Sequence, residues 1–122
     1  MGKAVGKCEW LIPDGFYPEI DRGGVYVSHE AVCVLNTGDM DAHIEITLFF
    51  ENQEPKSGFS ACCPAERTKH IRMDHIKNAD GSSVPRGVPY AMLVTSDVPV
   101  VVQYSRLDTS QVELGFMGLI AY

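Results

Sequence analysis

Apolar and polar residues alternate along most of this sequence with the period of two that is typical of β-strands. The clearest example is residues 42–50, AHIEITLFF, in which every even-numbered residue is apolar and three of the odd-numbered residues are His43, Glu45 and Thr47. Turn-forming residues at 36–41 come directly before this segment. The pattern predicts a hairpin that joins residues 30–36 with residues 42–50.

Further strands are expected in the second half of the chain. Residues 59–63 form a short strand that Pro64 stops, and residues 66–73 form a more polar one. The segment 77–89, KNADGSSVPRGVP, is the longest expected loop. We therefore expect a surface connection there and no domain boundary.

A second hairpin is expected near the C-terminus, with residues 90–95 and 98–106 separated by Ser96-Asp97. The valines at positions 98 and 100–102 predict a strand buried on both faces near its start. A polar residue at 108–110 could cap a short helix. Gly115 and Gly118 would end that helix early, which leaves a last strand near 116–121.

These elements predict an all-β fold with seven to nine short strands and at most one short helical turn. A small barrel is one arrangement of such strands, but we favour an antiparallel two-sheet β-sandwich that forms a single domain over residues 1–122. The edges of its sheets would be exposed, and association is a common way of covering them. We therefore expect a homo-oligomer.

Composition and charge narrow the function classes. The 122 residues are 45% hydrophobic and carry a formal net charge of −6, which suits one globular domain and argues against broad binding to nucleic acid. The N-terminus lacks an apolar run of signal-peptide length, and no segment approaches a membrane span. The four cysteines have no metal-binding spacing. These features predict a cytoplasmic protein without a cofactor.

Enzyme motifs are mostly missing from the sequence. There is no nucleophile elbow, phosphate-binding loop, zinc-protease motif or nucleotide fingerprint. His29 and Glu30 are adjacent in a strand-like segment, so their side chains would point to opposite faces and could not hold one metal. We predict no metal site and no catalytic activity.

Three strand-like segments carry polar groups that are costly to bury without partners, namely residues 25–36, 64–75 and 98–108. In residues 66–73 the alternation places His70 and Arg72 on one face, with Ile71 and Met73 on the core side. In residues 98–106 it separates Val100, Val102, Tyr104 and Arg106 from Val101, Gln103 and Ser105. A strand that becomes polar towards its end is typical of a pocket or an interface.

If the three segments meet, they form a polar site. Guanidinium and imidazole groups suit carboxylates, phosphates or the hydroxyl groups of a polyol, and Trp10 could stack on a sugar ring. Arg72 and Arg106 would donate hydrogen bonds, and Glu30 and Gln103 would accept them. The predicted ligand-binding residues are Trp10, His29, Glu30, Arg67, His70, Arg72, Gln103 and Arg106.

Two other classes of function stay open from the residues alone. One is a hydrolase or isomerase that uses His29 or His70 as general base beside Glu30 or Asp74. The other is a structural oligomer or a DNA-associated regulator, in which the polar strands make subunit contacts or Arg67, Lys69 and Arg72 contact phosphates.

Nearly the whole sequence closely resembles the sensory rhodopsin transducer family. The resemblance is carried by Ser-His-Glu at 28–30, by the Pro-Ala-x-Arg-Thr-Lys-His run at 64–70 and by Gln103 with Arg106-Leu107-Asp108. A further motif consists of Asn36, Gly38, Asp39, Asp41, Ala42 and His43. The resemblance implies a β-sandwich protomer, a homotetramer and a cytoplasmic role in signalling instead of catalysis. It also implies binding of a small ligand such as a sugar, and for some members a membrane photoreceptor as partner.

Overall fold

The computed structural model describes residues 3–18, 28–108 and 115–122, and all regular structure in these ranges is β. The strands are β1 (Lys7–Phe16), β2 (His29–Asn36), β3 (Ala42–Phe50), β4 (Lys56–Cys63), β5 (Arg67–Arg72), β6 (Pro89–Asp108) and β7 (Gly115–Ile120). Every pairing between them is antiparallel. The predicted all-β class is confirmed.

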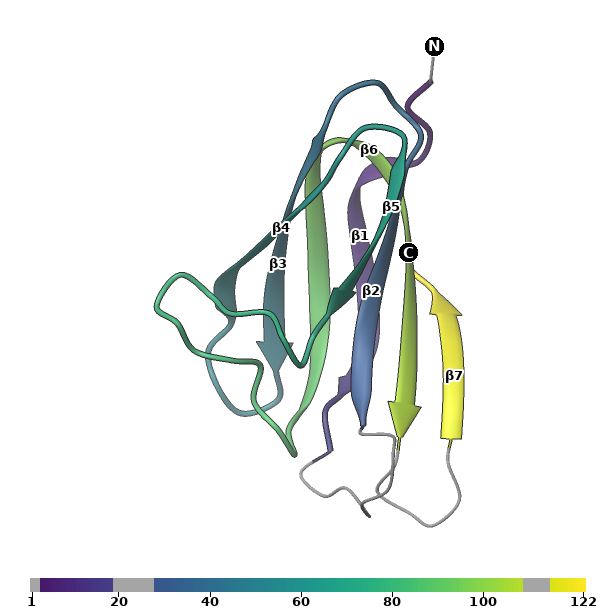
Figure 1. The fold of residues 1–122 in the computed structure, drawn as a ribbon. Coiled ribbons are helices and arrows are strands. Elements are labelled where there is room, and N and C mark those ends of the chain that lie inside the picture. Colours follow the sequence, from purple (N-terminus) through teal and green to yellow (C-terminus); the bar gives the residue numbers. More distant parts are fainter. Residues whose placement is uncertain (1–2, 19–27, 109–114) are drawn as a thin grey trace.

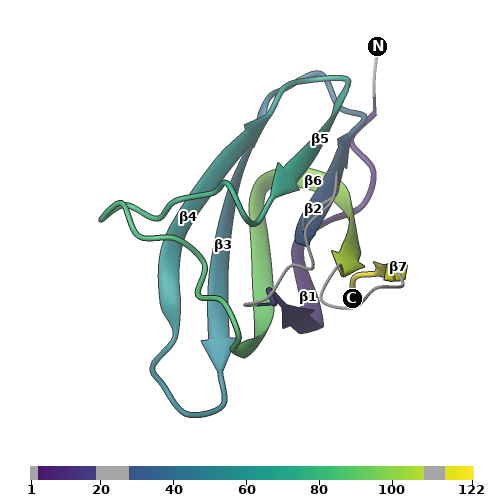
Figure 2. The same ribbon diagram turned by 60° about the horizontal axis from the view of Figure 1, so that its bottom comes forward.

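Strand β6, 20 residues long, organises the whole sheet. Its first half pairs with β1 and β3, and its second half pairs with β2 and β7, so the main strand order is β4-β3-β6-β2-β5. Because one strand belongs to both halves, the strands form a curled sheet (Figures 1 and 2). The two-sheet sandwich that the sequence predicts is not confirmed.

One hydrophobic core fills the inside of the curl. It consists of side chains on the inward side of each half of the sheet. They include Ile44, Ile46 and Leu48 of β3 and Val32 and Val34 of β2, all at most 2% exposed. Ile71 and Met73 are buried on the core side of β5 and just after it, as the alternation predicts. The alternation predicted for residues 42–50 is confirmed as well.

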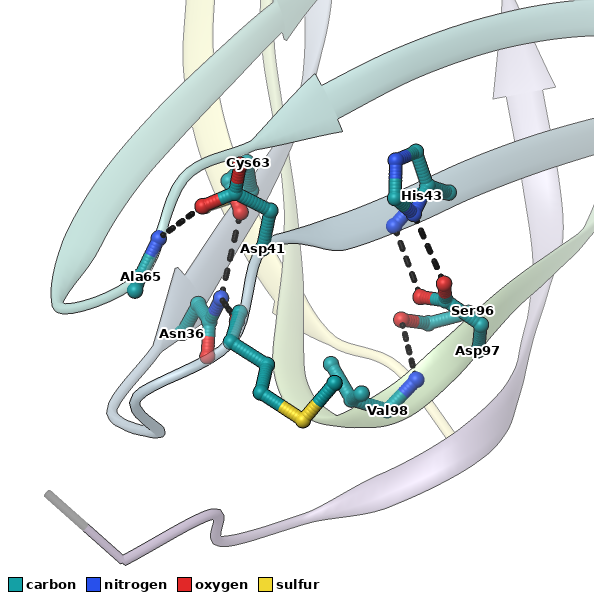
Figure 3. Close-up of polar contacts among 9 residues, drawn as sticks. Asn36, Asp41, His43, Cys63, Ala65, Ser96, Asp97 and Val98 are labelled. Atoms are coloured by element: carbon teal, nitrogen blue, oxygen red, sulfur yellow. Dashed lines mark hydrogen bonds and ion pairs between the residues drawn. The ribbon is translucent and has the colours of Figure 1, made fainter.

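Both predicted hairpins are wrong. Strands β2 and β3 do not pair, because β6 lies between them and residues 37–41 cross from one half of the sheet to the other. Strand β6 bends over near Ser96-Asp97 but continues through these residues, and its two halves do not pair with each other (Figure 1). At this bend Ser96 Oγ accepts from the amide of Val98 at 3.3 Å, and Asp97 Oδ1 accepts from the amide of His43 at 2.8 Å (Figure 3).

Other expectations can be compared with the structure directly. Val101 is 36% exposed, so β6 is not buried on both faces there. The last strand lies where it is expected, whereas the proposed helix start falls mainly at 109–110, outside the described residues.

The expected long loop is present as well: residues 77–88 contain no strand, only an isolated bridge between Lys77 and Ser83. No helix long and apolar enough to cross a membrane occurs in the described ranges.

Candidate ligand-binding site

A groove of about 750 Å³ lies on the face of β5, β2 and β6 that is turned away from the core. The strand register produces it. His70, Cys33 and Gln103 lie opposite one another in one row across the three strands, and Arg72, Ala31 and Ser105 form the next row. The lining consists of His29, Ala31, Cys33, Val34, Leu35, Thr68, His70, Arg72, Val101, Gln103, Ser105 and Gly118.

Small side chains in the middle of these rows make the surface concave. Ala31, Cys33 and Ser105 leave space between the longer side chains of β5 and Gln103. Gly118 of β7 adds to this space, because a Cβ at that position would lie 3.4 Å from Nε2 of Gln103. The hollow therefore follows from the sizes of side chains at alternate positions.

Arg72 is held in place by Asp74. Its Nε and Nη2 donate to the two carboxylate oxygens at 2.8 and 2.7 Å, which is the bidentate geometry that fixes a guanidinium group. Burial opposes ionisation of Asp74, but the hydrogen bonds and charge of Arg72 outweigh it and lower the pKa of Asp74. The same pairing raises the pKa of Arg72. The two charges largely cancel at this end of the groove.

The groove is therefore lined by polar groups with little net charge. His29, His70, Gln103, Thr68 and Ser105 offer donors and acceptors on a floor that is largely apolar. Leu35 and Val101, which are paired across β2 and β6, provide an apolar wall at one end. Such a surface is suited to a hydroxylated molecule with an apolar face.

Four of the eight predicted site residues, His29, His70, Arg72 and Gln103, lie in this groove. The other four do not line it. Trp10 is buried in β1, where its Nε1 donates to the carbonyls of Lys7 and Val100 at 3.1 and 2.9 Å and the Lys7 ammonium lies over its ring. Arg67 is exposed and donates to the carbonyl of Glu66.

Glu30, only 1% exposed, lies on the opposite side of β2 from the groove. Its carboxylate accepts hydrogen bonds from the hydroxyls of Tyr90 and Tyr104 and from the amide of Phe16. Burial raises the pKa of Glu30, although these hydrogen bonds and the charge of Arg106 act in the other direction. Arg106 is opposite Glu30 in the ladder between β2 and β6. These residues form a buried polar cluster that is separate from the groove.

The same geometry bears on the other two classes of function. Glu30 faces away from the groove that holds His29 and His70, and Asp74 is engaged by Arg72. For a phosphate-binding patch, Arg67 and Lys69 alternate with His70 and Arg72 along β5, so the three basic residues do not share a face. Among the described residues, no cluster of three or more His, Cys, Asp and Glu side chains could hold a metal ion.

Sequence reasoning missed the small and hydroxyl-bearing residues of the groove, Ala31, Cys33, Thr68, Ser105 and Gly118. Thr68 and Ser105 share the strand faces that were recognised for His70 and Gln103. The alternation could therefore have included them. The floor could not be found this way, because the sequence does not reveal which strands are neighbours.

The motif at 36–43 has a structural explanation (Figure 3). The buried Asn36 donates from Nδ2 to the carbonyls of Met40, Cys63 and Pro64 at 2.8, 3.1 and 3.3 Å. Asp41 accepts from the amide of Ala65, and His43 Nδ1 lies 2.7 Å from Oδ2 of Asp97. These contacts tie the loops at one end of the sheet to each other and to β6. They lie outside the groove.

The sequence matches the family of the Anabaena sensory rhodopsin transducer over residues 5–122. One similar solved structure is the crystal structure of Thermotoga maritima 1070, at 37% identity and a TM-score of 0.82, with 96% of this chain and 94% of that chain covered. Another is the Anabaena sensory rhodopsin transducer itself, at 38% identity and a TM-score of 0.75, with 84% of this chain and 98% of that chain covered. No curated protein matches the sequence.

Proposed function

This chain belongs to the Anabaena sensory rhodopsin transducer family, and from that membership we propose that it is a non-enzymatic signalling module that binds a small polar ligand. The observation that carries the proposal is the groove across β5, β2 and β6, where His29, His70, Arg72 and Gln103 surround a floor of small side chains. A pocket with a few convergent polar groups on a largely apolar surface is typical of small-molecule sites.

A neutral, sugar-like ligand fits the charges of the groove better than an anion. Asp74 offsets the positive charge of Arg72, which weakens the attraction for a carboxylate or phosphate group. The imidazole of His70 and the amide of Gln103 can exchange hydrogen bonds with hydroxyl groups. The apolar side chains of Leu35 and Val101 suit the C–H face of a sugar ring.

We propose in addition that the chain works as a cytoplasmic homotetramer with a signalling partner. The Anabaena relative is by its name the transducer of a sensory rhodopsin, so a membrane photoreceptor or a comparable receptor is the partner to test first. The exposed apolar side chains of β7, Leu119 and Ile120, support association between copies of the chain.

The ligand proposal is tested by a thermal-shift screen of neutral sugars, polyols, sugar acids and sugar phosphates. A ligand that binds only the folded chain raises the melting temperature as its concentration rises above Kd. Arg72→Ala should abolish the stabilisation while leaving the oligomer intact. Because this change also removes the guanidinium group that pairs with Asp74, His70→Ala serves as a second variant at an exposed position.

Lys69→Ala is the matched control, because Lys69 is an exposed neighbour of His70 on the same strand and does not line the groove. We expect it to keep the full stabilisation. If a ligand raises the melting temperature of all three variants by as much as it raises that of the original chain, the groove is not its site. If sugar acids or phosphates stabilise and neutral sugars do not, the proposed ligand class is wrong.

A further inference from the structure

A cysteine, a histidine and an aspartate lie in one row across β4, β3 and β6, on the outer face of the sheet. Cys62 is directly opposite His43 in the ladder between β4 and β3, so their side chains share a face. Ile44 is opposite Ser96 in the ladder between β3 and β6, which brings Asp97 level with His43. None of the three lines the groove. The row is therefore separate from the groove and does not depend on its ligand.

Asp97 fixes the imidazole of His43. Its Oδ1 accepts from the His43 amide at 2.8 Å, and its Oδ2 lies 2.7 Å from Nδ1 of the ring (Figure 3). These two hydrogen bonds lower the pKa of Asp97, so the carboxylate is ionised at neutral pH. An ionised carboxylate can only accept, so Nδ1 carries the proton and Nε2 of the neutral ring is left as an acceptor. The ring is thus held in the form that can take a proton at Nε2.

The thiol of Cys62 is accessible to small reagents. Cys62 is exposed, whereas the next residue, Cys63, is buried on the core side. Residues directly opposite in a ladder have Cβ atoms about 4.5–5.5 Å apart, so rotation of the Cys62 side chain can bring its sulfur close to the imidazole of His43. Cys8 is the other exposed cysteine, but it lies on β1, which pairs only with β6, and β6 contains no histidine.

We propose that Cys62 is a site of thiol–disulfide exchange with low-molecular-weight disulfides, with His43 as the proton carrier. Nε2 takes the thiol proton, and the thiolate attacks one sulfur of the disulfide. The bond between the two reagent sulfurs breaks as a new S–S bond to Cys62 forms, and the leaving thiolate takes the proton back from the imidazolium. The disulfide itself is the oxidant, and Asp97 stabilises the imidazolium. A base that is oriented by a carboxylate beside a thiol is typical of activated cysteines.

The test incubates the reduced full chain with glutathione disulfide at pH 7 and follows mixed-disulfide formation at each cysteine by mass spectrometry of fragmented peptides. Cys8 is the internal reference for an exposed thiol without a neighbouring imidazole. Because an ordinary thiol is only a few per cent ionised at pH 7, a proton acceptor beside it can raise the reaction rate considerably. We expect Cys62 to react about tenfold faster than Cys8.

His43→Gln removes the proton acceptor at an exposed position, and it should lower the rate at Cys62 to that of Cys8 without changing Cys8. Asp97→Asn keeps an oxygen for the His43 amide but removes the charge, and it should slow Cys62 by a smaller factor. Glu45→Gln, two residues from His43 on the same exposed face of β3, is the matched control and should leave the rate unchanged. The proposal is overturned if Cys62 reacts no faster than Cys8, or if Cys62 reacts as fast in His43→Gln as in Glu45→Gln.

Discussion

Among the described residues, Glu30 is the one acidic or basic side chain that is buried. A carboxylate that is 1% exposed loses most of its hydration, and three hydrogen bonds to two tyrosine hydroxyls and one amide replace it. The donors come from β6 and from the end of β1. Glu30 therefore connects three strands through a single side chain, and removing one of its partners would leave a buried polar group unsatisfied.

The raised pKa of Glu30 makes a prediction about pH. In the unfolded chain this carboxyl ionises near its ordinary value of 4.5, whereas burial keeps it protonated to higher pH in the folded chain. Its contribution to stability is therefore complete below about pH 4.5 and is lost as the pH rises through the folded pKa. Glu30→Gln cannot ionise, so its free energy of unfolding relative to the original chain should improve as the pH rises.

Urea unfolding of both chains at a series of pH values measures this difference. Glu45→Gln, at an exposed position on β3, is the control. Its free energy of unfolding should differ from that of the original chain by the same amount at every pH. The other titrating groups are common to all three chains and cancel in the comparison. A constant difference between Glu30→Gln and the original chain across the whole range would contradict the prediction.

How far the site could be predicted is clearest at single residues. Period-two alternation correctly placed His70 and Arg72 on the side of β5 away from Ile71 and Met73. It also placed His29 and Glu30 on opposite faces, which was used only to exclude a shared metal. The same argument separates Glu30 from the pocket of His29, although both were predicted for one site. Trp10 shows what the sequence alone could not predict. Its indole donates to a carbonyl 90 residues away, and that contact depends on how β1 and β6 pair.

At the scale of elements, the start of β1 depends on one glycine. Gly6 has a φ of +115°, and a Cβ at this position would lie only 2.0 Å from the carbonyl oxygen of Val100. The same oxygen accepts the hydrogen bond from Trp10 Nε1. The register between β1 and β6 shifts just after this point, between Lys7 and Glu9. The close approach of the two backbones thus requires a residue without a side chain.

We therefore predict that Gly6→Ala destabilises the chain by about 3 kcal/mol, because backbone strain adds to a steric clash. Gly81→Ala is the matched control. Gly81 also has a positive φ, of +88°, but nothing lies within 4 Å of the added Cβ, so only the strain of about 1 kcal/mol should remain. Urea unfolding followed by the fluorescence of Trp10, the only tryptophan, measures both. Equal losses would show that the contact with Val100 is unimportant.

The strands themselves were easier to predict than their partners. Residues 42–50 and 66–73 were recognised because alternation is a local property, written into each segment. The hairpin across 36–41 was wrong because Asn, Gly and Asp permit a tight turn and also a longer crossing between distant strands. Similarly, Ser96-Asp97 lies at a bend of the chain, but β6 continues through it and its two halves pair with other strands instead of with each other (Figure 1). Pairing is a long-range property that no short segment determines.

At the scale of the whole molecule, the end of β7 carries strongly exposed apolar side chains. Ile120 is 74% exposed and Leu119 41%, and Tyr122 just beyond the strand is 73% exposed. In the described residues β7 pairs only with β6, so one edge of the strand has no partner strand. Exposed edges and apolar side chains of this kind are usually covered by association. β7 is therefore the place where we expect copies of the chain to meet.

Light scattering coupled to gel filtration tests this expectation, and we predict a mass of four chains for the original protein. Ile120→Lys should shift the mass towards the monomer, because burying a charge in the contact is unfavourable and the apolar contribution of about 1.5–3 kcal/mol per isoleucine is lost. Met40→Lys is the control, since Met40 is similarly exposed, at 65%, but lies in the loop before β3. If the original chain is a monomer, or if both variants dissociate equally, β7 is not the contact. A tetramer that persists in Ile120→Lys would place the interface on another edge of the curled sheet, with β4 and β5 as the next strands to test.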